Sequence, residues 1–263
     1  MANPVQKVPS RQNLRRNMGL VREFGFLELN TLDTVMWDDD FLGDTIHGGY
    51  QTAVNGASAA ALTITTTGIG GTATMVTGTA TEGDSAVALG LEFEGRLNAV
   101  VAARVKISDI ADAKMEIGFT DAVADRGAVL VLDTTTFTAT DAAVWCFDTD
   151  GTNDYWHAAS TSNGHADAAN WTLTNAGSNV VPVNDTYETL IVALEGTGTA
   201  ACDVHFYRLN ADGYQTYTTT HAGTGPNANI ALTPWVYFQT RNGSDSKTMT
   251  VDYIKAWQRR TVS

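Results

Sequence analysis

Apolar and polar residues alternate in short runs from about residue 35 to the end of the chain. In Leu97–Ile107, Val101, Ala103 and Val105 share one parity, and therefore one face of an extended strand. Turn-forming Gly, Asn and Asp residues break the pattern about every 8–12 positions, the spacing typical of antiparallel β-proteins. The predicted strands are 35–41, two within 57–83 on either side of a Gly68–Gly71 turn, 86–93, 97–107, 115–119, 129–132, 143–147, 155–159, 171–174, 187–194, 201–209, 214–218, 234–239 and 248–258.

The spacing of these strands leaves no room for crossover helices, and the one expected helical element is a single turn near Ser108–Ala113. We therefore predict an all-β fold of two antiparallel sheets packed face to face, in a jelly-roll sandwich. The closing strand 248–258 is long and apolar on both faces. It is expected in the middle of a sheet.

The N-terminal 34 residues differ from the body and are predicted to form an extended arm, with the sandwich domain spanning residues 35–263. The first 22 residues carry five basic side chains and no acidic one, whereas the rest has 11 Lys and Arg against 29 Asp and Glu, a net charge near −18. Phe24 and Phe26 lie in an apolar stretch that is too hydrophobic for a free tail. The arm is expected to bind a partner or the body through Lys7, Arg11, Arg15, Arg16, Arg22, Phe24 and Phe26.

Composition argues against a membrane protein, a secreted protein and a nucleic-acid-binding protein. No apolar run of about 18 residues predicts a membrane span, and the basic start lacks the apolar core of a signal peptide, so synthesis in a cytoplasm is expected. The acidic body should repel nucleic acid. Cys202 shares parity with Val204 and Phe206 and is read as a core residue, and a disulfide with Cys146 is not favoured in that compartment.

Several segments resemble a known fold family. They are the first strand ending in Asp39-Asp40-Phe41, the pair Trp145-Cys146-Phe147-Asp148 and Tyr155-Trp156, the run 187–194 followed by 204–209, and the closing 251–257. Over residues 35 to 260 the chain is similar to concanavalin-like (laminin-G-like) jelly rolls. Modules of this kind recur in structural proteins of tailed bacteriophages, as capsid decoration proteins and in tail fibres. The resemblance implies such a role.

Glycosidases of the same fold carry two glutamates with an aspartate between them on one strand, and retention of configuration needs two carboxyls about 5–5.5 Å apart. The nearest match here is Glu116 to Asp121, but Gly118 stands where the central aspartate belongs. We read these residues as an exposed strand and its following loop, in which both carboxyls are dispensable. No catalytic residue is assigned, and a glycoside hydrolase ranks third among the functions considered.

Acidic, histidine and aromatic residues offer further candidate sites. The acidic runs Asp148-Thr149-Asp150 to Asp154 and Asp38–Asp40 offer oxygen ligands, but neither matches a calcium loop, and solvated acidic turns are preferred. The five histidines lack the spacing of a zinc site. Tyr155, Trp156 and Trp171 lie near loops and form the candidate glycan-binding surface. No metal or cofactor is expected.

These observations favour a non-enzymatic virion protein that decorates and stabilises a bacteriophage capsid. The expected partners are the major capsid protein and further copies of this chain in a trimer, with no membrane and no nucleic acid. The expected location is the capsid surface, and the alternative is a receptor- or glycan-binding module of a tail fibre.

Overall fold

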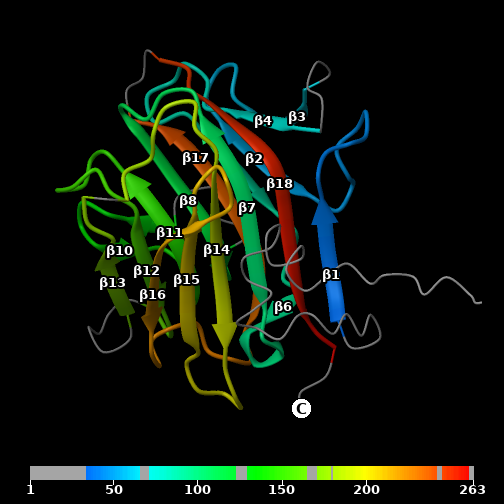
Figure 1. Ribbon diagram of the computed structural model, residues 1–263, viewed down its shortest axis with the longest axis vertical. Coiled ribbons are helices and arrows are strands. Elements are labelled where there is room, and N and C mark those ends of the chain that lie inside the picture. Colours follow the sequence, from blue (N-terminus) through cyan, green and yellow to red (C-terminus); the bar gives the residue numbers. More distant parts are fainter. Residues whose placement is uncertain are drawn as a thin grey trace, which may run out of the picture.

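Two antiparallel β-sheets lie face to face in the computed structural model, one behind the other in Figure 1. The structure describes residues 34–65, 71–122, 129–164, 171–178, 180–241 and 245–260. Sheet A runs in the order β16 (Gln215–His221), β15 (Asp203–Leu209), β14 (Glu188–Glu195), β7 (Val100–Ile107), β18 (Thr248–Arg259), β4 (Ala73–Val76) and β3 (Ala60–Ile64), and β1 (Thr34–Asp39) also pairs with β18. Sheet B runs in the order β13 (Trp171–Asn175), β12 (His157–Thr161), β11 (Ala142–Asp148), β8 (Ala113–Thr120), β17 (Ala231–Thr240), β5 (Asp84–Ala88) and β2 (Gln51–Asn55), and β6 (Phe93–Glu94) also pairs with β17. The predicted all-β, two-sheet sandwich is confirmed.

The core lies between the sheets and follows from the alternation in the sequence. Val101, Ala103 and Val105 of β7 all point into it and are buried. The side chain of Trp145, on β11 of sheet B, reaches across the core to sheet A. Its indole N–H donates to the backbone oxygen of Ile191 there, over 3.1 Å. Buried apolar side chains from both sheets thus form one continuous core, the largest stabilising contribution in such a fold.

The closing strand β18 occupies the interior of sheet A, as its two apolar faces predicted. It pairs with β7 on one side, and with β4 and β1 on the other. The pairing with β1 runs from Thr34 opposite Arg259 to Asp39 opposite Ile254, so the body begins at the edge of this central strand. In Figure 1, β1 lies beside the lower half of β18.

A short hairpin covers part of the outer face of sheet B. It consists of β9 (Leu130–Val131) and β10 (Thr136–Phe137), and the segment from Val129 to Ala139 packs on side chains of β11 and β17. Trp235 and Tyr237 are buried under it. The outer face of sheet B is therefore a second, smaller apolar layer.

Two local predictions have different outcomes. β3 and β4 form the expected antiparallel pair in the Thr- and Gly-rich region, although most of the turn between them lies outside the described residues. The helical turn expected near Ser108–Ala113 is wrong, because Asp109 instead accepts the backbone N–H of Ala111 in a non-helical turn. The one helical element among the described residues is a 3-10 turn, η1 (Gly95–Leu97).

The two cysteines are buried and free. Cys202 lies in the core beside Val204 and Phe206, as predicted from its parity. Cys146 lies on the outer face of sheet B, under the hairpin. Within the described ranges, no helix has the length and apolar character needed to cross a membrane.

Candidate functional site

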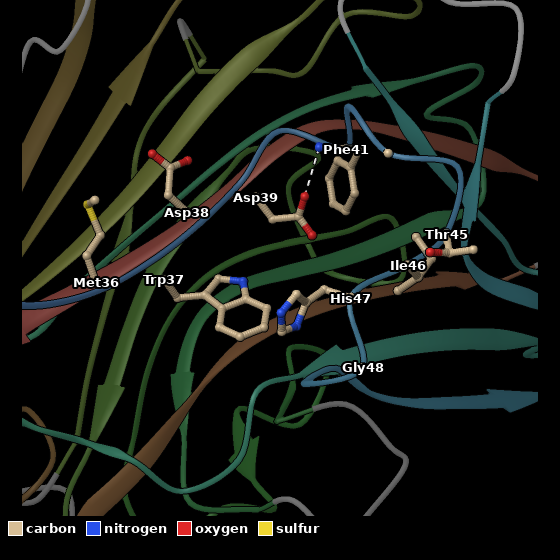
Figure 2. Close-up of a pocket in the computed structure, with 10 residues that line it drawn as sticks. Met36, Trp37, Asp38, Asp39, Phe41, Thr45, Ile46, His47 and Gly48 are labelled. Atoms are coloured by element: carbon tan, nitrogen blue, oxygen red, sulfur yellow. Dashed lines mark hydrogen bonds between the residues drawn. The ribbon is translucent and has the colours of Figure 1, made fainter.

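A pocket of about 530 Å³ lies between the end of β1 and the start of β2. Figure 2 shows the residues that line it, which all come from β1 and the loop that follows it. They are Met36, Trp37, Asp38, Asp39, Phe41, Gly43, Thr45, Ile46, His47 and Gly48. The pocket thus combines an aromatic wall with two carboxylates.

Trp37 forms the aromatic wall. Its ring meets the imidazole of His47 edge-on at 4.4 Å between centroids, and its indole N–H donates to the hydroxyl of Tyr50 over 3.3 Å. Gly49 passes directly beneath this ring, because a Cβ added there would lie 2.6 Å from the indole. Burial raises the pKa of Tyr50, so its hydroxyl stays protonated and continues to position the tryptophan.

The carboxylates are held by the backbone and by sheet A. Asp39 accepts the backbone N–H of Phe41 over 2.8 Å, the contact drawn in Figure 2. Phe41 adopts a left-handed φ of 53°, which turns the loop back toward the pocket. Asp38 pairs with Lys255 of β18 at 2.9 Å, which ties this end of β1 to the central strand.

This arrangement is suited to hold a polar ring-shaped ligand. An aromatic face can stack on the apolar side of such a ring, while carboxylate oxygens accept its hydroxyl groups. From the sequence, Asp38–Asp40 are candidate metal ligands and part of the fold resemblance, and no sugar-binding role is predicted for them. The described residues bring together no group of three or more His, Cys, Asp or Glu side chains that could hold a metal ion.

Trp37 and His47 were missed as site residues, because ten positions separate them and the loop between them has no strand pattern. One feature of the sequence could have indicated this pocket. An aromatic residue, three acidic residues and several glycines occur together around one predicted strand end.

The predicted glycan-binding surface of Tyr155, Trp156 and Trp171 does not form. Trp156 is completely buried, and its indole N–H donates to the carboxylate of Glu188 over 3.2 Å. Tyr155 precedes the start of β12, whereas Trp171 pairs with Thr161 at the end of that strand. The strand pattern did not reveal that Trp156 points into the core, or that Tyr155 and Trp171 lie near opposite ends of β12.

Glu116 is not on an exposed strand, which corrects the sequence interpretation. It is completely buried, and its carboxylate accepts the backbone N–H groups of Val129 at 2.7 Å and Leu130 at 2.9 Å, and the indole N–H of Trp235 at 3.1 Å. These bonds fasten the β9–β10 segment to sheet B. Asp121 lies in the loop after β8, and its carboxylate accepts the backbone N–H of Thr140, which lies between β10 and β11.

Asp148 likewise serves the packing of sheet B. It is completely buried and pairs with Arg241, whose Nε lies 2.8 Å from its carboxylate, while the ammonium of Lys114 lies 3.6 Å away. Burial alone would lower the pKa of Lys114, but the carboxylates of Glu116 and Asp148 outweigh it and raise that pKa. The cations neutralise a buried acidic group that the sequence offered as a calcium ligand. Asp150 remains half exposed beside Arg241, and Asp154 is exposed.

Among the described residues, His221 makes a contact that resembles part of a nucleophilic site. Its ring nitrogens lie 2.8 Å from the hydroxyl of Ser160 and 2.9 Å from that of Thr174. Burial lowers the pKa of His221 to about 4 and hides the group from solvent. The contact joins β16 to β12 and β13 across the sandwich.

The arm residues Lys7, Arg11, Arg15, Arg16, Arg22, Phe24 and Phe26 lie outside the described residues. Their role stays a prediction.

Solved structures share this fold at low sequence identity. Lectin II from Ulex europaeus is 9% identical, covers 87% of this chain and 100% of its own, and superimposes with a TM-score of 0.56. The CBM2 module of the evolved Dit of Lactobacillus casei BL23 phage J-1 is 12% identical, with 87% and 97% coverage and a TM-score of 0.53. A protein of unknown function from Shewanella oneidensis MR-1 is 13% identical, with 88% and 89% coverage and a TM-score of 0.53.

No protein-family model matches the chain, and no curated protein matches its sequence. The solved structures show that the fold is that of the lectin-like, concanavalin-type jelly rolls, which also occurs in the CBM2 module of a phage Dit. At these identities the likeness concerns the fold alone.

Proposed function

We propose that this protein is a non-enzymatic structural protein of a tailed-bacteriophage virion, and that it decorates and stabilises the capsid. In this proposal the N-terminal arm grips the major capsid protein, and the acidic sandwich stands on the outer surface as part of a homotrimer. A protein that binds the assembled shell alone stabilises that shell by mass action. The shared fold of a phage Dit module agrees with a virion role.

The observation that carries this proposal is the attachment point of the arm. The arm leads directly into β1, which pairs over its whole length, Thr34–Asp39, with the central strand β18. Asp38 and Lys255 add an ion pair across these strands. The arm is therefore joined, through all six residue pairs of β1, to the strand in the middle of sheet A.

The test is attachment of purified protein to empty capsids. The full chain should co-sediment with capsids, and residues 34–263 alone should stay folded but remain in the supernatant. Changing Arg11, Arg15 and Arg16 together to Glu should weaken attachment most at low salt, because screening of charges is then weakest. Arg96→Glu, a partly exposed basic residue of the body, is the matched control. Capsid binding by residues 34–263 that equals that of the full chain would contradict the role of the arm.

A second candidate function, glycan binding, is favoured by the pocket between β1 and β2. Trp37 and His47 would stack on a sugar ring, and Asp39 would accept its hydroxyl groups. The proposed ligand class is a neutral hexose unit of a surface polysaccharide.

The pocket is tested on a glycan array, followed by calorimetry with the best sugar. Trp37→Ala and Asp39→Asn should each weaken sugar binding at least tenfold, whereas Tyr214→Ala, which removes an exposed aromatic ring elsewhere, should not. Binding that survives Trp37→Ala would place the ligand at another site. Absence of binding to any sugar would remove this candidate and leave the capsid proposal intact.

A further inference from the structure

The outer face of sheet A carries an apolar stripe on the side opposite the core. On β7, Val101 and Ala103 point into the core, so Val100 and Ala102 point outward. The same alternation holds on β14, β15 and β18. The outer stripe consists of Val100, Ala102, Ile191, Ala193, Tyr207, Leu209 and Trp257.

Strand register makes the outer stripe continuous. Ala193 lies opposite Val100, which in turn lies opposite Trp257 on β18. Met36 of β1 lies opposite Trp257 and extends this row to the edge where the body begins. Tyr207, Ile191 and Ala102 form a parallel row beside it.

The outer stripe is shielded from solvent. Its side chains are at most 7% exposed, and Val100 and Ile191 are each 1% exposed. The main contacts of its strands run to neighbours in sheet A and to sheet B, so none of the described elements lies across this face. Small side chains such as Val100 and Ala193 on a bare sheet face would meet water.

The other undescribed stretches are badly placed to cover the outer stripe. Residues 66–70 join β3 to β4, and residues 242–244 lead into β18 near Thr248, at the end of β18 far from Trp257. Residues 123–128 lead from β8 to the β9–β10 hairpin, residues 165–170 join β12 to β13 of sheet B, and residue 179 is a single position between β13 and β14. Residues 261–263 are too few to cross four strands.

Residues 1–33 begin at the right place and have the necessary length. They join β1 at Thr34, which lies opposite Arg259 and two residues from the Met36–Trp257 pair. The distance from β1 across β18, β7 and β14 to β15 is roughly 19 Å, which about six extended residues span. The apolar stretch Leu20–Leu29 ends five residues before Thr34 and can reach every part of the outer stripe.

One acidic pair at the end of this face can take an arginine of the arm, whose residues 20–29 also contain Glu23 and Glu28. Glu195 of β14 and Asp203 of β15 lie opposite each other at the end of the sheet near Trp257, and both are exposed. Like charges directly opposite each other destabilise a strand pair, so a cation bound between them is favourable. Arg22 lies within the apolar part of the arm, and Arg15 and Arg16 lie just before it.

We propose that residues 20–29 of the arm dock on the outer stripe of their own chain, with an arginine of the arm against Glu195 and Asp203. The basic residues before position 17 then project from the body at a fixed place. This docking concerns the free protein and does not depend on attachment to a capsid.

Cross-linking between engineered cysteines tests the proposal in the full chain. Ala102→Cys, in the outer stripe, is combined in turn with Leu20→Cys, Phe24→Cys or Leu27→Cys and oxidised in dilute solution. The native thiols compete poorly, because burial raises the pKa of Cys146 and raises that of Cys202 to about 12. At least one pair should give an intrachain disulfide in high yield, identified by peptide mass.

Val54→Cys, at an exposed position in β2 of sheet B, is the matched control for Ala102→Cys. Its yield with the same arm cysteines should be at least fivefold lower. Equal yields at the two positions would overturn the docking. Disulfides found only between isotopically labelled and unlabelled chains would instead show that the stripe takes the arm of a second copy.

Binding of an apolar dye gives a second test, because the outer stripe should become exposed to solvent when the arm cannot dock. A full chain with Leu20, Phe24, Phe26 and Leu27 changed to Ser should bind an apolar fluorescent dye several-fold more strongly than the wild type. A chain with Lys7, Arg11 and Arg15 changed to Ser should not. Unchanged dye binding in the first variant, at unchanged circular dichroism, would also overturn the proposal. The two proposals can be told apart. If the full chain fails to attach to capsids while the disulfides with Ala102→Cys still form, the proposed function is contradicted and the docking stands.

Discussion

At the scale of single residues, buried carboxylates act as structural fasteners. Glu116 accepts three N–H donors and faces Lys114, so its charge is fully compensated inside the protein. Burying a charge is tolerated only with such partners, and removal of one partner leaves the others without compensation. The two carboxyls that sequence reading compared with a hydrolase thus have unequal roles, because Glu116 is buried and Asp121 is partly exposed.

Glu116→Gln is therefore expected to lower the free energy of unfolding by about 3 kcal/mol. The amide loses the charge that faces Lys114 and presents an NH₂ group to N–H donors. Urea denaturation followed by fluorescence measures the change. Asp121→Asn, which affects a single hydrogen bond near the surface, should cost less than about 1 kcal/mol. Equal effects of the two substitutions would contradict the fastening role.

His221 should make the protein sensitive to acid. Its pKa is about 4 in the folded state, against an ordinary value of 6.5, because the ring is buried between Ser160 and Thr174. Between these two values the unfolded chain binds a proton that the folded chain does not, so stability falls as the pH drops from about 6.5 to 4. The loss is on the order of 3 kcal/mol.

Unfolding of the wild type and His221→Gln at pH 7 and pH 4.5 measures this loss. The difference between the two proteins should shrink at the lower pH. Burial raises the pKa of Asp84 to about 6, an effect of opposite sign on stability that both proteins share. A stability difference that is the same at both pH values would contradict the assignment.

At the scale of elements, β8 is the strand on which sheet B depends. It pairs with β11 on one side and with β17 on the other. Gly118 of β8 lies opposite Val144 of β11 and opposite Trp235 of β17. A Cβ at this position would lie 2.1 Å from the backbone oxygen of Ala143. The position that a glycosidase would fill with an aspartate therefore has no space for any side chain.

Gly118→Ala should lower the free energy of unfolding by about 3 kcal/mol or cause misfolding, because backbone rather than flexible side chains must move. Thermal unfolding measures it, with Gly48→Ala as the control, where an added Cβ meets nothing within 4 Å. A Gly118→Ala protein with the melting temperature of the wild type would show that the strands are less closely packed than described.

At the scale of the whole molecule, the two sheets share one core and should unfold together. Trp145 and Phe206 meet across the sheets at 5.5 Å between ring centroids, and the indole of Trp145 also bonds to sheet A. We expect a single urea transition in which near- and far-ultraviolet circular dichroism coincide. Two separate transitions would show that the sheets, or the β9–β10 cover, unfold independently.

The sequence alone determined the fold class, because the alternation of side chains along a strand has a period of two and is set by local geometry. Val101, Ala103 and Val105 predicted the inner face of β7, and the two apolar faces of 248–258 predicted its place inside sheet A. The parity of Cys202 predicted its burial for the same reason. Each of these inferences needs only neighbours within one strand.

The tertiary structure decided which polar and aromatic residues are buried and which meet. Glu116 and Trp156 look like surface residues in the sequence, but the hairpin at Val129 and the carboxylate of Glu188 lie far from them along the chain. The pocket at Trp37 likewise depends on a loop that folds back through the left-handed turn at Phe41. Burial and contact between distant residues arise from the packing of whole sheets, and local periodicity carries no information about that packing.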